Sequence, residues 1–72
     1  MAKNLSEQIR IGQAIREYRF KNGISLKQFG ELLGVSPQAV HKWEHHITYP
    51  DITLIPAISS LLGVSVSHLF GE

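Results

Sequence analysis

Apolar residues along this chain recur every three or four positions, which is the spacing of amphipathic helices. No segment alternates between apolar and polar residues for long enough to indicate a strand. The pattern predicts helices over about 6–22, 26–33, 37–45, from 51–53 to 62, and after Ser65. The inward positions are expected to be Ile11, Ile15, Tyr18, Phe29, Leu32, Leu33, Val40, Trp43, Leu54, Ile55, Ile58, Leu61 and Leu62. The sequence therefore predicts an all-α domain.

The ends of two central helices carry matching start signals. Ser25 and Ser36 can each cap a helix by accepting a hydrogen bond from a backbone N–H two or three residues on, and Gln28 completes a capping box with Ser25. Gly34 lies between the two helices, where the first must end in a left-handed residue. Pro37 suits the first helical position. Two helices joined this closely must cross steeply, which predicts a helix-turn-helix over about 25–45.

One proline constrains where the fourth helix can begin. Pro56 is tolerable in the first turn of a helix but would cost about 3 kcal/mol deeper inside, so we place the start of the fourth helix at 51–53.

Composition limits the domain organisation. The chain has 72 residues, of which 43% are hydrophobic and 18% charged. This predicts one compact domain over 1–72, with residues 1–5 flexible. There is no cysteine, no apolar stretch that could span a membrane and no signal-peptide pattern, so a cytoplasmic protein is expected.

Charge is unevenly distributed along the chain. The net charge is only +1, but residues 1–24 hold five basic and two acidic residues, a balance of +3. Residues 25–50 balance at zero, and residues 51–72 hold only two acidic residues. A basic end and an acidic end are typical of a protein with one face toward DNA and another toward a different partner.

The helix-turn-helix and its surroundings resemble the Cro/phage-repressor (XRE) family of DNA-binding regulators. The residues that carry the resemblance are Ile11-Gly12, Ile15-Arg16, Arg19, Gly23, the Ser25 cap, Gly30, Leu33-Gly34-Val35-Ser36, Val40, Trp43-Glu44, Pro50, Leu62-Gly63-Val64-Ser65 and Leu69-Phe70. The resemblance implies a five-helix phage-repressor-like fold. It also implies a transcription regulator, most simply a repressor, that binds double-stranded DNA. Because one helix-turn-helix covers a half-site, it implies a homodimer on a pseudo-palindromic operator, with the helix at 37–45 in the major groove.

The expected DNA contacts fall into two groups. Gln38 and Lys42 are one helical turn apart on the face opposite Val40 and Trp43, where Gln can read adenine and Lys can read guanine. The full set of expected base contacts is Pro37, Gln38, Ala39, His41 and Lys42. The expected phosphate contacts are Arg19, Leu26 through its backbone, Lys27, Ser36, His45, His46 and Thr48. From the family, Arg19 and Glu44 are expected to form a partly buried ion pair; solvated surface charges are the alternative.

The sequence departs from the family pattern at three places. Leu26 replaces the Gln that often follows the cap, so a side-chain contact to phosphate is lost there and the free N–H groups of the helix remain. Gly30 stands where Ala is usual, at a cost of about 1 kcal/mol in helix propensity. His45-His46 replaces a common Asn-Gly turn, so one of the two histidines is expected to adopt a left-handed conformation, which is uncommon but accessible to histidine.

The C-terminal segment suggests a partner surface. Val66 and Phe70 are one helical turn apart, and we expect them to form a weak dimer face; the alternative is that Phe70 folds back on the fourth helix. A rival function is an antitoxin-type module that neutralises a toxin through the C-terminal half and binds DNA secondarily.

The segment His41-Lys-Trp-Glu44-His45 matches the H-x-x-E-H signature of zinc proteases. The spacing could hold a metal on a helix, but a catalytic site needs a third ligand and a cleft that a chain of this size hardly provides. Other catalytic constellations are missing from the sequence. We therefore expect no enzyme activity, no metal site and no cofactor.

Overall fold

The computed structural model describes residues 9–71, which form five α-helices and one short 3-10 helix. The elements are α2 (Ile11–Asn22), α3 (Leu26–Leu33), α4 (Pro37–Glu44), a 3-10 turn (Ile52–Leu54), α5 (Ile55–Leu62) and α6 (Val66–Leu69). No strand occurs between residues 9 and 71, so the predicted all-α, five-helix fold is confirmed. The expected flexibility of residues 1–5 and the predicted helix start near Ser6 lie outside the described residues. None of the described helices is long and apolar enough to cross a membrane.

The helix ends follow the local signals. The Ser25 hydroxyl accepts from the Gln28 N–H at 3.0 Å, and the Gln28 side chain accepts from the Ser25 N–H at 2.8 Å, which completes the capping box. Gly34 ends α3 with φ of 73°. The Ser36 hydroxyl caps α4 by accepting from Ala39 at 3.1 Å. Pro56 lies in the first turn of α5, immediately after the 3-10 turn capped by Asp51. The bonds of Ser25 and Ser36, together with the left-handed Gly34, hold α3 and α4 in the tight turn that the sequence predicted.

The start of the first described helix differs from the prediction. Residues 9 and 10 are not helical, and α2 begins at Ile11 with Arg10 as its N-cap. The Arg10 N–H donates instead to the Leu69 carbonyl at 2.8 Å, which ties the entry to α2 to the end of α6. A bond between the two ends of the described chain therefore sets this boundary, and the prediction that residues 9 and 10 belong to the first helix is wrong.

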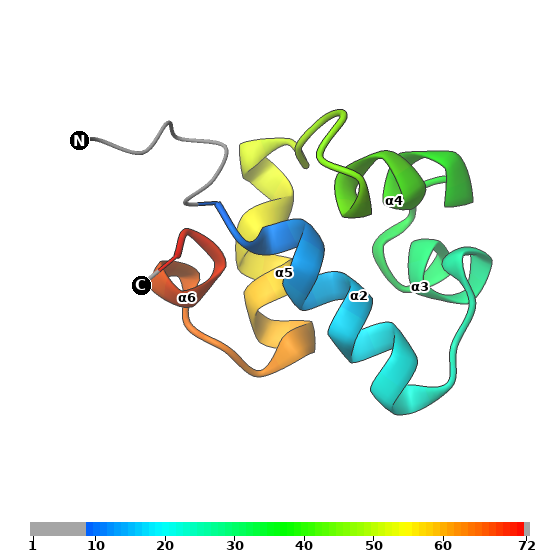
Figure 1. Cartoon of the computed structure of the whole chain (residues 1–72), viewed down its shortest axis with the longest axis horizontal. Coiled ribbons are helices and arrows are strands. Elements are labelled where there is room, and N and C mark those ends of the chain that lie inside the picture. The colour runs from blue at the N-terminus through cyan, green and yellow to red at the C-terminus, as the bar shows by residue number, and fades with distance from the viewer. Residues whose placement is uncertain (1–8, 72) are drawn as a thin grey trace.

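The core lies where the helices meet (Figure 1). Its buried side chains are Ile11, Ile15, Phe29, Val40, Trp43, Ile55, Ile58 and Leu69. Leu32 was expected to face inward, but 57% of its surface is exposed. It lies at the edge of the apolar stripe of α3, whose centre is Phe29, and the main partner of that helix is α4. Its inward assignment was wrong because helical periodicity does not say how wide a buried stripe is.

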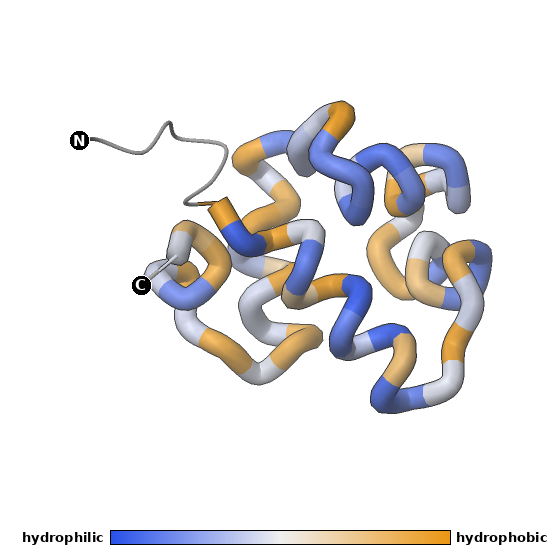
Figure 2. Tube along the Cα trace, viewed as in Figure 1, coloured by the Kyte–Doolittle hydropathy of each residue, from blue (hydrophilic) through white to orange (hydrophobic). Residues whose placement is uncertain are grey.

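Two glycines permit close approaches of the backbone. A Cβ on Gly12 would overlap the Trp43 carbonyl of α4, and a Cβ on Gly30 would come within 2.5 Å of the Val35 carbonyl. The first glycine lets α2 and α4 touch directly, and the second lets the turn fold back on α3. Along the trace, α5 is mostly apolar and α4 mostly polar (Figure 2). The core therefore holds α4 by one face only and leaves a polar face outward.

Candidate nucleic-acid interface

The outer face of α4 presents an ordered row of polar side chains. Gln38, His41 and Lys42 are exposed, whereas Val40 and Trp43 are buried on the other side of the same helix. Pro37 and Ala39 are half-buried at the beginning of α4. Three of the five expected base-contact residues are therefore freely accessible, and the other two offer only part of their apolar surface.

A shallow hollow of about 360 Å³ lies beside this row. It is lined by Leu26 at the start of α3 and by Pro37, Gln38, His41 and Lys42 of α4. The fold thus brings the first residue of α3 next to the outward face of α4. A ligand that touches Gln38 and Lys42 would also lie near the N-terminus of α3.

The N-terminus of α3 can accept an anion. Leu26 and Lys27 occupy its first two positions, where backbone N–H groups have no partner within the helix. The Leu26 side chain packs against the core, so only its N–H is suited to a phosphate. Lys27 is exposed at the same end and adds a positive charge. The Ser36 hydroxyl, in contrast, is already used as the cap of α4.

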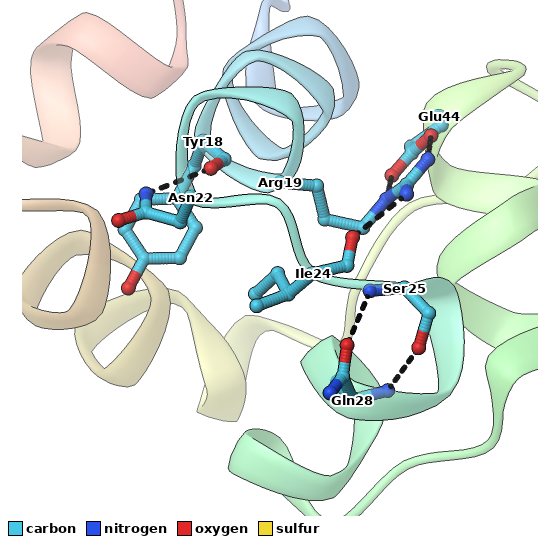
Figure 3. A network of polar contacts seen from close by, with 7 residues as sticks. All are labelled: Tyr18, Arg19, Asn22, Ile24, Ser25, Gln28 and Glu44. Atoms are coloured by element: carbon cyan, nitrogen blue, oxygen red, sulfur yellow. Dashed lines mark hydrogen bonds and ion pairs between the residues drawn. The ribbon is translucent and has the colours of Figure 1, made fainter.

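A bidentate ion pair fixes the far end of α4 to α2 (Figure 3). Arg19 Nε donates to Glu44 Oε2 at 2.7 Å, and Arg19 Nη2 donates to Glu44 Oε1 at 2.9 Å. Arg19 Nη1 also donates to the Ile24 carbonyl at 3.1 Å. The Arg19 and Glu44 side chains are only 13% and 4% exposed. The hydrogen bond to Glu44 raises the pKa of Arg19 further above its usual value, despite an opposing effect of burial.

The expected ion pair is thus present, and it limits what Arg19 can do otherwise. A guanidinium has five N–H donors, and three of those of Arg19 are committed within the protein. Two donors are left for a phosphate at a side chain that is nearly buried. Most of the hydrogen-bonding capacity of Arg19 is therefore used to join α2 to the end of α4.

The sequence analysis did not identify a cluster of one aromatic and two basic side chains on α2. The guanidinium carbons of Arg16 and Arg19 lie 5.3 and 5.1 Å from the centre of the exposed Phe20 ring. Both distances are within the range of cation–π attraction. Arg16 is exposed and lies one helical turn before Phe20, so this spacing was the signal available in the sequence. Arg16 is therefore a more accessible cation than Arg19 on this side of α2.

The loop after α4 carries the last expected phosphate contacts. His45, His46 and Thr48 are all exposed, and His46 adopts the predicted left-handed conformation with φ of 58°. The Ile47 N–H donates to the Lys42 carbonyl at 2.9 Å, which keeps the loop against the end of α4. His45 and His46 are therefore exposed polar residues immediately after the last turn of α4.

The H-x-x-E-H segment is not arranged as a protease site. The Glu44 carboxylate, which would have to act as the base, is bound by Arg19. The His41 and His45 rings lie together, with centres 4.2 Å apart. Within residues 9–71 no group of three His, Cys, Asp or Glu side chains is placed to hold a metal. The chemistry that this surface supports is hydrogen bonding and charge pairing with an anionic ligand.

Comparisons with known proteins agree with this geometry. A family model described as helix-turn-helix matches residues 15–69. The chain is 36% identical, over 63 residues and 86% of its length, to the HTH-type transcriptional regulators SinR of Bacillus licheniformis and Bacillus subtilis. It spans only 57% of the length of these two relatives.

A solved structure has the same fold. It is a crystal structure of the P22 c2 repressor protein in complex with synthetic operator 9T. The match has a TM-score of 0.76 and 33% sequence identity, and it covers 86% of this chain and 96% of the repressor chain. The similarity therefore extends over nearly the whole repressor chain in that complex.

Proposed function

The chain belongs to the Cro/C1-type (XRE) helix-turn-helix family, and from this we propose that it binds double-stranded DNA as a sequence-specific transcription regulator. The observation that carries the proposal is the exposed row of Gln38, His41 and Lys42 on a helix that an ion pair holds in place. The fold match to a repressor crystallised with its operator supports it. The relatives are regulators and a repressor, so an antitoxin-type module is not favoured.

We place α4 in the major groove, with its polar row against the edges of the bases. Gln38 would pair with adenine and Lys42 with guanine, and His41 would reach a neighbouring position. Pro37 and Ala39 would contribute apolar contact, for example with a thymine methyl group. The hollow beside Leu26 leaves room for the DNA backbone next to these residues.

Phosphate contacts would flank α4 on both sides. At the start of α3 these contacts come from the N–H of Leu26 and from Lys27. At the start of α4 a further contact comes from Ser36. Beyond the end of α4 they come from His45, His46 and Thr48. Arg19 contributes at most its two uncommitted donors. Phosphate contacts set the register on the duplex but read no sequence themselves.

One helix-turn-helix covers a half-site, so we propose that a homodimer binds a pseudo-palindromic operator. The two copies of α4 would lie about one turn of DNA, roughly 34 Å, apart. Such an arrangement is typical of a repressor that blocks a promoter, and we propose this role in the cytoplasm.

Selection of binding sites from random duplex DNA, followed by alanine substitutions, tests the proposal. Gln38→Ala and Lys42→Ala should each cost about 1–3 kcal/mol on the selected site and relax the preference at one base position. Lys27→Ala should weaken binding to all sequences alike and reduce the salt slope by about one unit. Lys21→Ala, on an exposed part of α2, serves as the matched control and should change neither. An unchanged motif after both Gln38→Ala and Lys42→Ala would show that α4 is not the reading helix.

A further inference from the structure

Two histidine side chains lie together at the C-terminal end of α4. His41 belongs to the helix and His45 is its C-cap residue, one helical turn further on, and both side chains are exposed. The centres of the two rings are 4.2 Å apart, and the ring planes are inclined by 40°. Side chains four residues apart on a helix lie on the same face, so one ligand can contact both.

The separation of the rings suits a metal ion that prefers nitrogen ligands. Imidazole is a preferred ligand of Zn²⁺, Ni²⁺ and Cu²⁺, whereas Mg²⁺ and Ca²⁺ prefer oxygen. Zinc–nitrogen bonds of about 2.0–2.1 Å at a tetrahedral angle hold the two nitrogens about 3.3 Å apart. A small rotation of either exposed ring brings one nitrogen of each to that separation. The two histidines therefore already have the spacing of a chelating pair.

We propose that His41 and His45 together hold one divalent transition-metal ion, such as Zn²⁺, on the outward face of α4. The expectation of no metal site rested on the needs of a catalytic centre, which requires a third protein ligand. An ion at an exposed position needs fewer protein ligands, because water completes its coordination. The proposal therefore revises that expectation for a surface site and leaves the exclusion of a protease site unchanged.

The charges around the pair act in opposite directions. The C-terminus of a helix carries a partial negative charge, which favours a cation at this position. The Glu44 carboxylate is 4% exposed and bound by Arg19, so it is not a ligand for an ion on the outer face. Lys42, which lies between the two histidines in the sequence and is exposed, opposes a second positive charge nearby. Lys42→Gln should therefore bind the ion a few-fold more tightly than wild type.

A bound ion would change how α4 meets DNA, a step that rests on the proposed function. His41 lines the same hollow as Gln38 and Lys42, and His45 is proposed to lie near a phosphate. The ion would add two positive charges here and keep coordination positions in which a phosphate oxygen can replace water. Phosphate contacts raise affinity without reading bases. The ion should therefore strengthen binding to all sequences alike and steepen the salt dependence.

Calorimetric titration of the metal-free protein with ZnCl₂, and separately with NiCl₂, tests the site without DNA. Wild type should bind either ion, and a titration with MgCl₂ should show no binding. His41→Gln and His45→Gln should each weaken Zn²⁺ binding about tenfold or more, because loss of a mere hydrogen-bond partner of a metal ligand already costs about 10–100-fold. His68→Gln is the matched control, because His68 is an exposed histidine on α6, and this variant should bind as wild type does.

Two further measurements keep the test sharp. His46→Gln asks whether the neighbouring exposed histidine is the ligand instead, and this variant should bind Zn²⁺ as wild type does. Zn²⁺ should raise the melting temperature of wild type but not of His41→Gln or His45→Gln, because only the folded helix holds both ligands together. Circular dichroism establishes that each variant is folded. A wild type that does not bind Zn²⁺, or a His45→Gln variant that binds it normally, would overturn the proposal.

DNA binding separates this inference from the proposed function. Zn²⁺ should raise the affinity of wild type for a selected operator and for an unrelated duplex by the same factor, and it should leave the affinity of His45→Gln unchanged. If wild type binds no DNA sequence specifically, the proposed function fails, and the titration still decides the metal site. If Zn²⁺ binds to wild type but leaves its affinity for both duplexes unchanged, the inferred contact between the ion and DNA is wrong.

Discussion

Removing one partner of the Arg19–Glu44 pair should destabilise the fold strongly and unequally. Arg19→Ala leaves the Glu44 carboxylate, 4% exposed, without either of its charged hydrogen bonds. A buried charge that loses its partner costs about 3–5 kcal/mol of folding stability. Because the Arg19 side chain is partly exposed, water can reach the space that it leaves, so we expect a loss near the lower end, about 3 kcal/mol. Glu44→Ala should cost less, about 2 kcal/mol, for two reasons. Arg19 keeps its bond to the Ile24 carbonyl, and a carboxylate at the end of α4 is unfavourable to the helix dipole.

These losses are large for a chain of this size. A stability of about 0.05–0.15 kcal/mol per residue gives about 4–11 kcal/mol for the whole chain. An unfolding entropy of about 2.1 cal/mol/K per residue means that each kcal/mol lowers the melting temperature by about 7 °C. Arg19→Ala should therefore melt about 20 °C below wild type, and Glu44→Ala about 14 °C below.

Urea denaturation of both single variants and of the double variant measures the coupling. We expect a coupling free energy of about 1.5–2.5 kcal/mol, because each single substitution already breaks the same bonds. Glu17→Ala is the matched control, because Glu17 is an exposed acid on α2 that accepts a hydrogen bond from Gln13 at 3.2 Å. It should cost less than about 0.5 kcal/mol. Additive effects of Arg19→Ala and Glu44→Ala, with coupling below about 0.5 kcal/mol, would refute the assignment of the pair as a structural lock.

Two further predictions concern the backbone. Gly12→Ala gains about 1 kcal/mol of helix propensity but forces a Cβ onto the Trp43 carbonyl, at a cost of about 1–3 kcal/mol or more, so urea denaturation should show a net loss. Gln13→Ala, one residue on, should be neutral or stabilising, and a stabilised Gly12→Ala would contradict the close approach of α2 and α4. The Thr53 N–H and hydroxyl lower the pKa of Asp51 below its usual 3.8, so this carboxylate stabilises the fold above that value and loses its effect as pH falls through the lowered pKa. Asp51→Asn should therefore melt below wild type at neutral pH, and the difference should shrink as the pH is taken below that pKa; a difference that does not change with pH would contradict it.

The amino-acid sequence by itself determined the helix ends that depend on near neighbours. The Ser25 capping box, the left-handed Gly34 and the position of Pro56 each involve groups within a few residues of one another. The left-handed residue of the pair His45-His46 was expected from the family resemblance, and the structure assigns it to His46. Helical periodicity likewise placed Val40 and Trp43 inward and Gln38 and Lys42 outward on α4. Such features are decided by local stereochemistry, so they can be predicted before the fold is known.

Tertiary structure decided the features that join distant segments. The start of α2 depends on a bond from Arg10 to Leu69, and the exposure of Leu32 depends on how far its neighbours extend over α3. The Arg19–Glu44 pair was predicted only from the family resemblance, because the two residues are 25 positions apart and no local pattern links them. An apolar hollow brings together residues from both ends of the described chain and from the segment that leads from α4 into α5: Ile9, Ile11, Tyr49, Pro50, Ile52, Ile55 and Phe70. A periodic pattern shows which face of a helix is apolar, but only the packing of all helices shows which apolar residues are left uncovered.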